Sequence, residues 1–130
     1  MGGHGAIVCA LKKPGFYQSV SAFSPISAPS KVAWGEKAFS AYLGADKSKW
    51  LEWDSCELLK SSNTKINILV DQGLADEFLD KQLRPELLEQ ACQQGGHQLK
   101  LRRHAGHDHS YYFISTYIGE HIAYHAALLS

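Results

Sequence analysis

Acidic side chains follow one predicted strand of this 130-residue chain, and histidines follow the next predicted strand. The apolar run 66–73 leads into LADEFLD, and this region holds four carboxylates: Asp71, Asp76, Glu77 and Asp80. The alternating run 97–103 leads into HAGHDH, which contributes His104, His107, Asp108 and His109. Loops at the carboxyl ends of parallel strands meet at one edge of the sheet. The pattern therefore predicts an acid–histidine pair, in which the histidine moves protons and the carboxylate fixes its tautomer.

Residue spacing leaves several candidates open for each member of this pair. Asp71 could simply end its strand, and Asp80 is a candidate N-cap for the helix predicted from about residue 83. Asp108 is adjacent to His109, but neighbouring side chains on an extended loop generally point apart. We therefore expect the acid to come from residues 71–80 and the histidine from residues 104–109.

Apolar periodicity predicts helices and strands in alternation along the chain. Strands are expected at 17–25, 66–73 and 97–103. Helices are expected at 4–13, 35–44, 50–62 with Asp54 as an N-cap, 83–94 and 111–129. This order requires crossover connections, parallel strands and helices on both faces of the sheet. Three strands would leave an edge unprotected, so the predicted fold class is α/β, the carboxy-terminal half of a larger domain.

The composition excludes several classes of protein. The hydrophobic fraction of 45% and the charged fraction of 20% are typical of a globular protein. The 13 basic residues balance 13 acidic ones, so no overall field favours nucleic acid or an anionic membrane. We find no stretch long enough to span a bilayer and no signal-peptide pattern. The three cysteines (Cys9, Cys56 and Cys92) are widely spaced, which predicts reduced, mostly buried thiols and a cytoplasmic location.

The histidines also allow a metal site as an alternative. His104, His107 and His109 fall within six residues, and His121 and His125 lie four apart on the last predicted helix. Zinc accepts such ligands. However, the loop lacks the H-x-H-x-D-H spacing of the metallo-β-lactamase type, and histidines near a helix end also suit its dipole. A third alternative is a non-catalytic interaction fragment that covers its exposed apolar surface with another chain.

The opening MGGHGA places small residues at the head of a predicted helix. Such residues follow the nucleophilic serine in the strand–turn–helix elbow of α/β-hydrolases. Four further blocks match one family in the same order: KKPGFYQSVSAFSPI, WGEKAFSAYLG, DQGLADEF and DHSYYFI. On these motifs, which cover essentially the whole chain, the sequence resembles the S-formylglutathione hydrolase (esterase D) family of α/β-hydrolases.

The resemblance implies a role for three residues. Asp76 in DQGLADEF would be the triad acid, and His109 in DHSYYFI would be the triad histidine. Met1 would supply one backbone N–H of the oxyanion hole. The family serine would precede Met1 in a G-H-S-M-G-G-H-G pattern, and this sequence contains no G-x-S-x-G motif. We therefore expect residues 1–130 to be the carboxy-terminal part of a single α/β-hydrolase domain that is inactive alone.

The activity implied by the resemblance is hydrolysis of thioesters and esters without a cofactor. The expected substrate is S-formylglutathione, cleaved to glutathione and formate in formaldehyde detoxification. The expected partners are this small molecule and a missing amino-terminal half or another chain; a homodimer is also compatible with the sequence, and neither nucleic acid nor membrane is expected. Tyr111 and Tyr112 are mainly expected to pack at the start of the last helix, with the lining of an acyl pocket as the alternative. Trp34 is mainly expected to pack in the core or at a cap, with substrate contact as the alternative.

Overall fold

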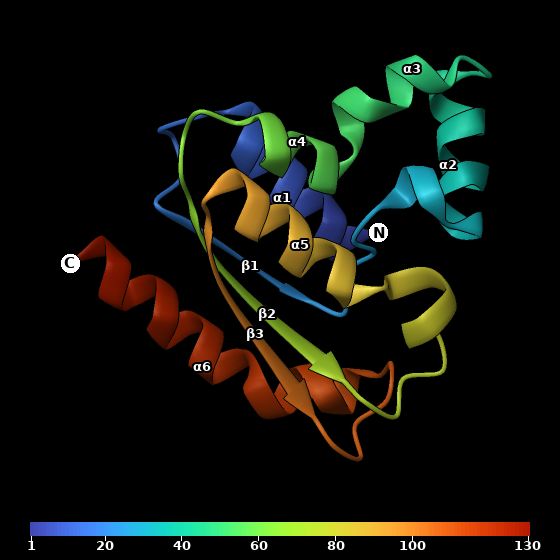
Figure 1. Cartoon of the computed structure of the whole chain (residues 1–130). Coiled ribbons are helices and arrows are strands. Elements are labelled where there is room, and N and C mark those ends of the chain that lie inside the picture. The colour runs from blue at the N-terminus through green and yellow to red at the C-terminus, as the bar shows by residue number, and fades with distance from the viewer.

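The computed structural model describes all residues 1–130, and its centre is a parallel sheet with the strand order β1-β2-β3. The strands are β1 (Ser19–Phe23), β2 (Asn67–Gly73) and β3 (Gln98–His104). Figure 1 shows helices on both faces: α1 (Gly2–Lys12), α4 (Ser55–Ser61) and α5 (Pro85–Gly95) on one, and α6 (Tyr111–Leu129) on the other. The predicted α/β class is therefore confirmed. None of the helices is both long and apolar enough to cross a membrane.

The central strand, β2, is buried because elements cover it on every side. Ile68 and Val70 are fully buried, and Ile68 pairs with Val20 of β1 and with Leu99 of β3. The main core lies between the sheet and the helices α1, α4 and α5, which contribute Ile7, Leu59 and Leu88 among others. A run of apolar residues such as that in β2 is typical of a strand with both faces covered.

The connection from β1 to β2 is divided into more helical pieces than the sequence predicts. It contains η1 (Pro29–Lys31), α2 (Ala33–Leu43), α3 (Lys47–Trp50) and η2 (Leu51–Trp53), followed by α4. Asp54 caps α4, as predicted, and its Oδ1 accepts hydrogen bonds from the N–H groups of Cys56 and Glu57. Its Oδ2 accepts from the backbone N–H and the hydroxyl of Ser30. One buried carboxylate thus starts the helix and anchors the preceding loop.

The prediction that Asp80 caps the next helix is wrong. That helix, α5, begins at Pro85, and the residue before it, Arg84, adopts a left-handed conformation with φ 46°. Proline suits the first helical position because its missing N–H would have no partner there. Asp80 lies instead in a separate π-helical turn, η3 (Leu79–Leu83), and is exposed.

The first helix packs closely on the end of β1. A Cβ atom at Gly3 would lie 3.1 Å from the Cβ atoms of both Ala22 and Pro25, so a side chain there would crowd the strand. The next residue, His4, is 4% exposed, and its Nε2 accepts a hydrogen bond from the N–H of Ser55 at 3.3 Å. His4 therefore joins α1 to the start of α4.

We expect protonation of His4 to destabilise the fold at acidic pH. Burial lowers the pKa of His4 from 6.5 to about 4, although the field of Asp54 opposes this shift. The unfolded chain binds this proton more readily than the folded chain. The stability that neutral His4 contributes is therefore fully present above pH 6.5 and is lost as the pH falls toward 4. The free energy of unfolding should decrease by about 3 kcal/mol over this range through His4. Urea unfolding at a series of pH values measures it.

The His4→Gln variant is the control for this prediction, because glutamine offers Ser55 an acceptor that does not titrate. Its stability should depend less steeply on pH than that of the wild-type chain. Parallel curves for the two proteins would show that His4 does not contribute.

Candidate active site

The turns that follow β2 and β3 are joined by backbone hydrogen bonds. The register of the two strands ends with Gly73 opposite His104. Beyond that pair, the N–H of Leu74 donates to the carbonyl of His104, and the N–H of Ala75 donates to the carbonyl of His107, both at 2.9 Å. Strand pairing thus continues into the turns, and the side chains that follow are held close together.

Asp76 and His109 form a hydrogen bond across these turns. The Nδ1 atom of His109 lies 2.7 Å from Oδ2 of Asp76. The Asp76 side chain is fully buried, and its oxygens also accept from the Phe78 N–H at 2.9 Å and from Nε2 of Gln72 at 3.3 Å. The His109 side chain is 42% exposed. A neutral His109 that donates from Nδ1 to the carboxylate keeps Nε2 as an acceptor, which is the arrangement a general base requires.

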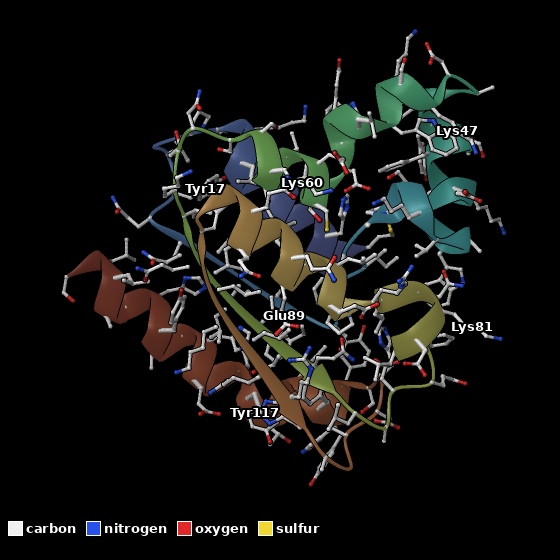
Figure 2. The ribbon with its side chains drawn as sticks, in the orientation of Figure 1. Tyr17, Lys47, Lys60, Lys81, Glu89 and Tyr117 are labelled. Carbon is white, nitrogen blue, oxygen red and sulfur yellow. The ribbon has the colours of Figure 1, made fainter.

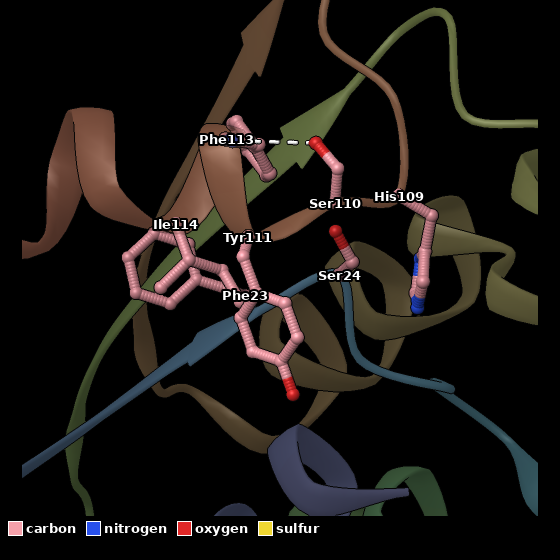
Figure 3. Close-up of a pocket in the computed structure, with 7 residues that line it drawn as sticks. All are labelled: Phe23, Ser24, His109, Ser110, Tyr111, Phe113 and Ile114. Carbon is pink, nitrogen blue, oxygen red and sulfur yellow. Dashed lines mark hydrogen bonds between the residues drawn. The ribbon is translucent and has the colours of Figure 1, made fainter.

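A cavity of about 260 Å³ adjoins His109 (Figure 3). It is lined by Phe23, Ser24, His109, Ser110, Tyr111, Phe113 and Ile114. Ser24 directly follows β1 and has φ 47°, which is uncommon for a residue other than glycine. The ring of Phe78, from the turn after β2, meets the ring of His109 edge-on with centroids 5.5 Å apart. Residues that follow all three strands therefore gather around His109.

The other acidic candidates do not contact His109. Asp71 is fully buried, but it is hydrogen-bonded to Arg102, His104 and His121. Asp80 and Asp108 are exposed, and their side chains make no hydrogen bond within the chain. Among the acids left open by the sequence, Asp76 is the one hydrogen-bonded to His109.

The histidines weighed as metal ligands do not gather at one site, although two of them share a partner. The partners are Asp71 for His104 and His121, Tyr117 for His107, Asp76 for His109, and Ser19 and Ser21 for His125. No group of three or more histidine, cysteine or acidic side chains is arranged to hold a metal ion. His104 is also the last residue of β3 and not part of the loop. The geometry therefore does not support the metal alternative.

Met1 lies at the head of α1 and is 53% exposed. Its carbonyl accepts a hydrogen bond from the N–H of Gly5 at 2.8 Å. Its side chain lines a separate, mostly apolar cavity with residues of α1 and α2, including Phe39. Met1 makes no hydrogen bond with Asp76 or His109, so its place in an oxyanion hole stays a prediction.

Two of the aromatic residues near the site do not pack as mainly expected, although Tyr111 lines the cavity beside His109. Tyr111 and Tyr112 do not pack in the interior, because they are 87% and 76% exposed. Trp34 packs on Phe78 with ring centroids 4.4 Å apart, and Phe78 in turn contacts His109. Sequence reasoning does not identify Phe78, because an apolar residue in such a segment predicts core packing. Its position two residues after Asp76 is the one available signal.

A parallel sheet covered by helices, with an acid–histidine pair at its carboxyl edge, defines the class of α/β-hydrolases. The model of the family described as "Putative esterase" matches residues 1–126, and the chain belongs to this esterase family. An S-formylglutathione hydrolase from Agrobacterium tumefaciens is 48% identical, with a TM-score of 0.94. The match covers 99% of this chain and 47% of that enzyme, so the chain spans about half of its length. The resemblance predicted from the motifs is therefore confirmed.

Two more distant structures share the fold alone. A putative dipeptidyl aminopeptidase IV from Bacteroides ovatus is 18% identical, with a TM-score of 0.64, over 84% of this chain and 15% of that one. An acylaminoacyl peptidase from Pyrococcus horikoshii is 15% identical, with a TM-score of 0.57, over 80% and 18%. At such low identity these proteins carry no argument about the substrate.

We expect the Gly73→Ala substitution to disrupt the candidate site. A Cβ atom at Gly73 would lie 2.2 Å from the carbonyl oxygen of His107, so the turn that carries His109 must move. Overpacking of this kind should cost about 1–3 kcal/mol of stability. Gly119→Ala is the matched control, because Gly119 lies within α6 with no atom near its Cβ position. The free energy of unfolding of this variant should increase by about 0.5–1 kcal/mol. Urea unfolding of both variants measures the difference, and equal stabilities would contradict the close approach at Gly73.

Proposed function

We propose that this chain supplies the acid–base half of the active site of a serine hydrolase that cleaves thioesters and esters. Asp76 is the acid and His109 is the general base and general acid. The observation that carries the proposal is the 2.7 Å hydrogen bond between Nδ1 of the half-exposed His109 and the buried carboxylate of Asp76. The membership of the chain in an esterase family supports it.

In this mechanism Nε2 of His109 removes the proton from a serine hydroxyl as the serine attacks the substrate carbonyl. The imidazolium that forms is stabilised by the adjacent carboxylate of Asp76. The imidazolium then returns the proton to the leaving thiolate. His109 next activates water in the same way, and the water attacks the acylated serine to release the carboxylic acid product. The nucleophilic serine lies outside residues 1–130 in this proposal, and the backbone N–H of Met1 is one oxyanion donor.

The proposed substrate is S-formylglutathione, hydrolysed to glutathione and formate as a step of formaldehyde detoxification. The 48% identity with the Agrobacterium enzyme supports this substrate over other thioesters. Residues 1–130 would then be the carboxy-terminal part of one catalytic domain, whose amino-terminal part is a necessary partner. Three free cysteines, of which Cys56 and Cys92 are buried, fit a reducing compartment such as the cytoplasm.

A chimaera tests the proposal directly. This chain would replace the matching part of the Agrobacterium enzyme, so that the remaining part supplies the serine. The folded chimaera should hydrolyse S-formylglutathione, and the His109→Ala substitution should abolish that activity. A folded chimaera without activity, or one in which His109→Ala stays active, would show that the proposal is wrong.

In the same chimaera, Asp76→Asn should lower kcat by roughly 10⁴, because an amide can hold the imidazole in the wrong tautomer. KM should change little, because the lost interaction belongs mainly to the transition state. Asp80→Asn is the control, because Asp80 is exposed and makes no contact with His109. Its kcat should be close to that of the unsubstituted chimaera. Steady-state kinetics with S-formylglutathione measures both variants. Loss of activity in Asp80→Asn but not in Asp76→Asn would contradict the assignment.

The 130-residue chain by itself should show no triad esterase activity. Without a nucleophile, only the modest contributions of binding and oxyanion donors remain. An assay of the purified chain with a short-chain aryl ester checks this. A turnover of about 1–10³ per second, typical of an intact enzyme, that a serine-directed phosphonate abolishes would show that the chain contains its own nucleophile.

A further inference from the structure

A second carboxylate, Asp71, lies near the end of β2 and is fully buried. Its Oδ1 is 2.6 Å from Nε of Arg102 and 3.0 Å from Nε2 of His104. Its Oδ2 is 2.6 Å from Nη2 of Arg102 and 2.9 Å from Nε2 of His121. Burial by itself would raise the pKa of Asp71, but the bonds from His121, Arg102 and His104 hold that pKa well below its usual range. Both oxygens therefore belong to a charged carboxylate with two donors each.

The donors come from both sides of the loop that carries His109. Arg102 and His104 belong to β3, which precedes this loop, and His121 belongs to α6, which follows it. Tyr117 of α6 (labelled in Figure 2) adds a further contact. Its ring stacks on His104 with centroids 3.9 Å apart. One carboxylate thus ties together β2, β3 and α6, the three elements from which the turns of Asp76 and His109 extend.

We propose that Asp71 is a positioning residue for His109. It contacts neither His109 nor Asp76, and it acts by fixing both ends of the loop between β3 and α6. Its importance for catalysis rests on the proposed function, whereas its effect on the orientation of His109 is a property of the chain alone.

The charge and the shape of the carboxylate are both needed for this role. The guanidinium of Arg102 makes two parallel bonds to the two oxygens of Asp71, which fixes their relative orientation. An asparagine in place of Asp71 would offer one acceptor atom and would turn its N–H₂ group toward a donor. Removing Arg102 instead leaves the buried charge with only the imidazoles of His104 and His121 as partners, and the surrounding elements must move to compensate for the lost cation.

The experiment measures the tautomer of neutral His109 in the purified 130-residue chain by ¹⁵N NMR of the histidine rings. The hydrogen bond to Asp76 holds the wild-type ring with its proton on Nδ1. In Arg102→Gln and in Asp71→Asn the ratio of the Nδ1–H to the Nε2–H form should fall by about tenfold, the effect of weakening one ordinary hydrogen bond. Far-UV circular dichroism establishes that each variant is folded.

Arg103→Gln is the matched control. Arg103 is the next residue of β3 and makes a comparable two-atom bond to Glu89 on the α5 side of the sheet (Figure 2), away from Asp71. Its removal should leave the tautomer of His109 unchanged. An unchanged tautomer in folded Arg102→Gln, or an equal change in Arg103→Gln, would overturn the proposal.

A second pair of variants covers the case in which Asp71→Asn does not fold. His104→Leu removes one donor to Asp71, whereas His104→Gln keeps an N–H₂ group within reach of it. The tautomer ratio should fall in His104→Leu and recover in His104→Gln, and equal effects would overturn the positioning role. No substrate is used, so an inactive chimaera would contradict the proposed function without changing this result.

Discussion

The parallel pairing of β2 with β3 is the constraint on which the candidate site depends. The register brings Gly73 opposite His104, and two further backbone hydrogen bonds carry the pairing into the turns beyond. Gly73 is required at this point because the carbonyl of His107 occupies the space of a side chain. The short distance between Asp76 and His109 follows from this arrangement of backbone, since each lies a few residues beyond a paired strand end.

Two buried carboxylates at this edge of the sheet have contrasting surroundings. Asp71 is enclosed by a guanidinium and two imidazoles, and the adjacent Arg102 cation balances its charge. Asp76 is bonded by a backbone N–H, an amide and the half-exposed His109, and no cation other than a protonated His109 is paired with it. Such a carboxylate stabilises a positive charge that forms on the imidazole during a proton transfer. The same residue type therefore connects elements of the fold at Asp71, and in the proposed mechanism it serves acid–base chemistry at Asp76.

The elements could be predicted to a large extent because local signals define them. The apolar, β-branched run of β2, the cap at Asp54 and the long pattern of α6 all appear in the structure close to their predicted bounds. The sequence-based predictions fail where contacts with neighbouring structure set the bounds of an element. Asp80 has the residue type of a cap, but Pro85 sets the start of α5 and a separate turn encloses Asp80.

The sequence by itself determined the α/β class, the parallel direction of the strands and the two segments that contain Asp76 and His109. These features depend on periodicity and on the rule that such loops meet at one edge. Residue spacing left the acid open, and the family resemblance indicated Asp76. The tertiary structure showed that Asp76 is the acid that contacts His109, because that contact depends on the register of β2 against β3. It also assigned Asp71 to Arg102, His104 and His121, which are 31 to 50 residues away along the chain. Hydrogen bonds between distant residues leave no local pattern, so no spacing in the sequence reveals them.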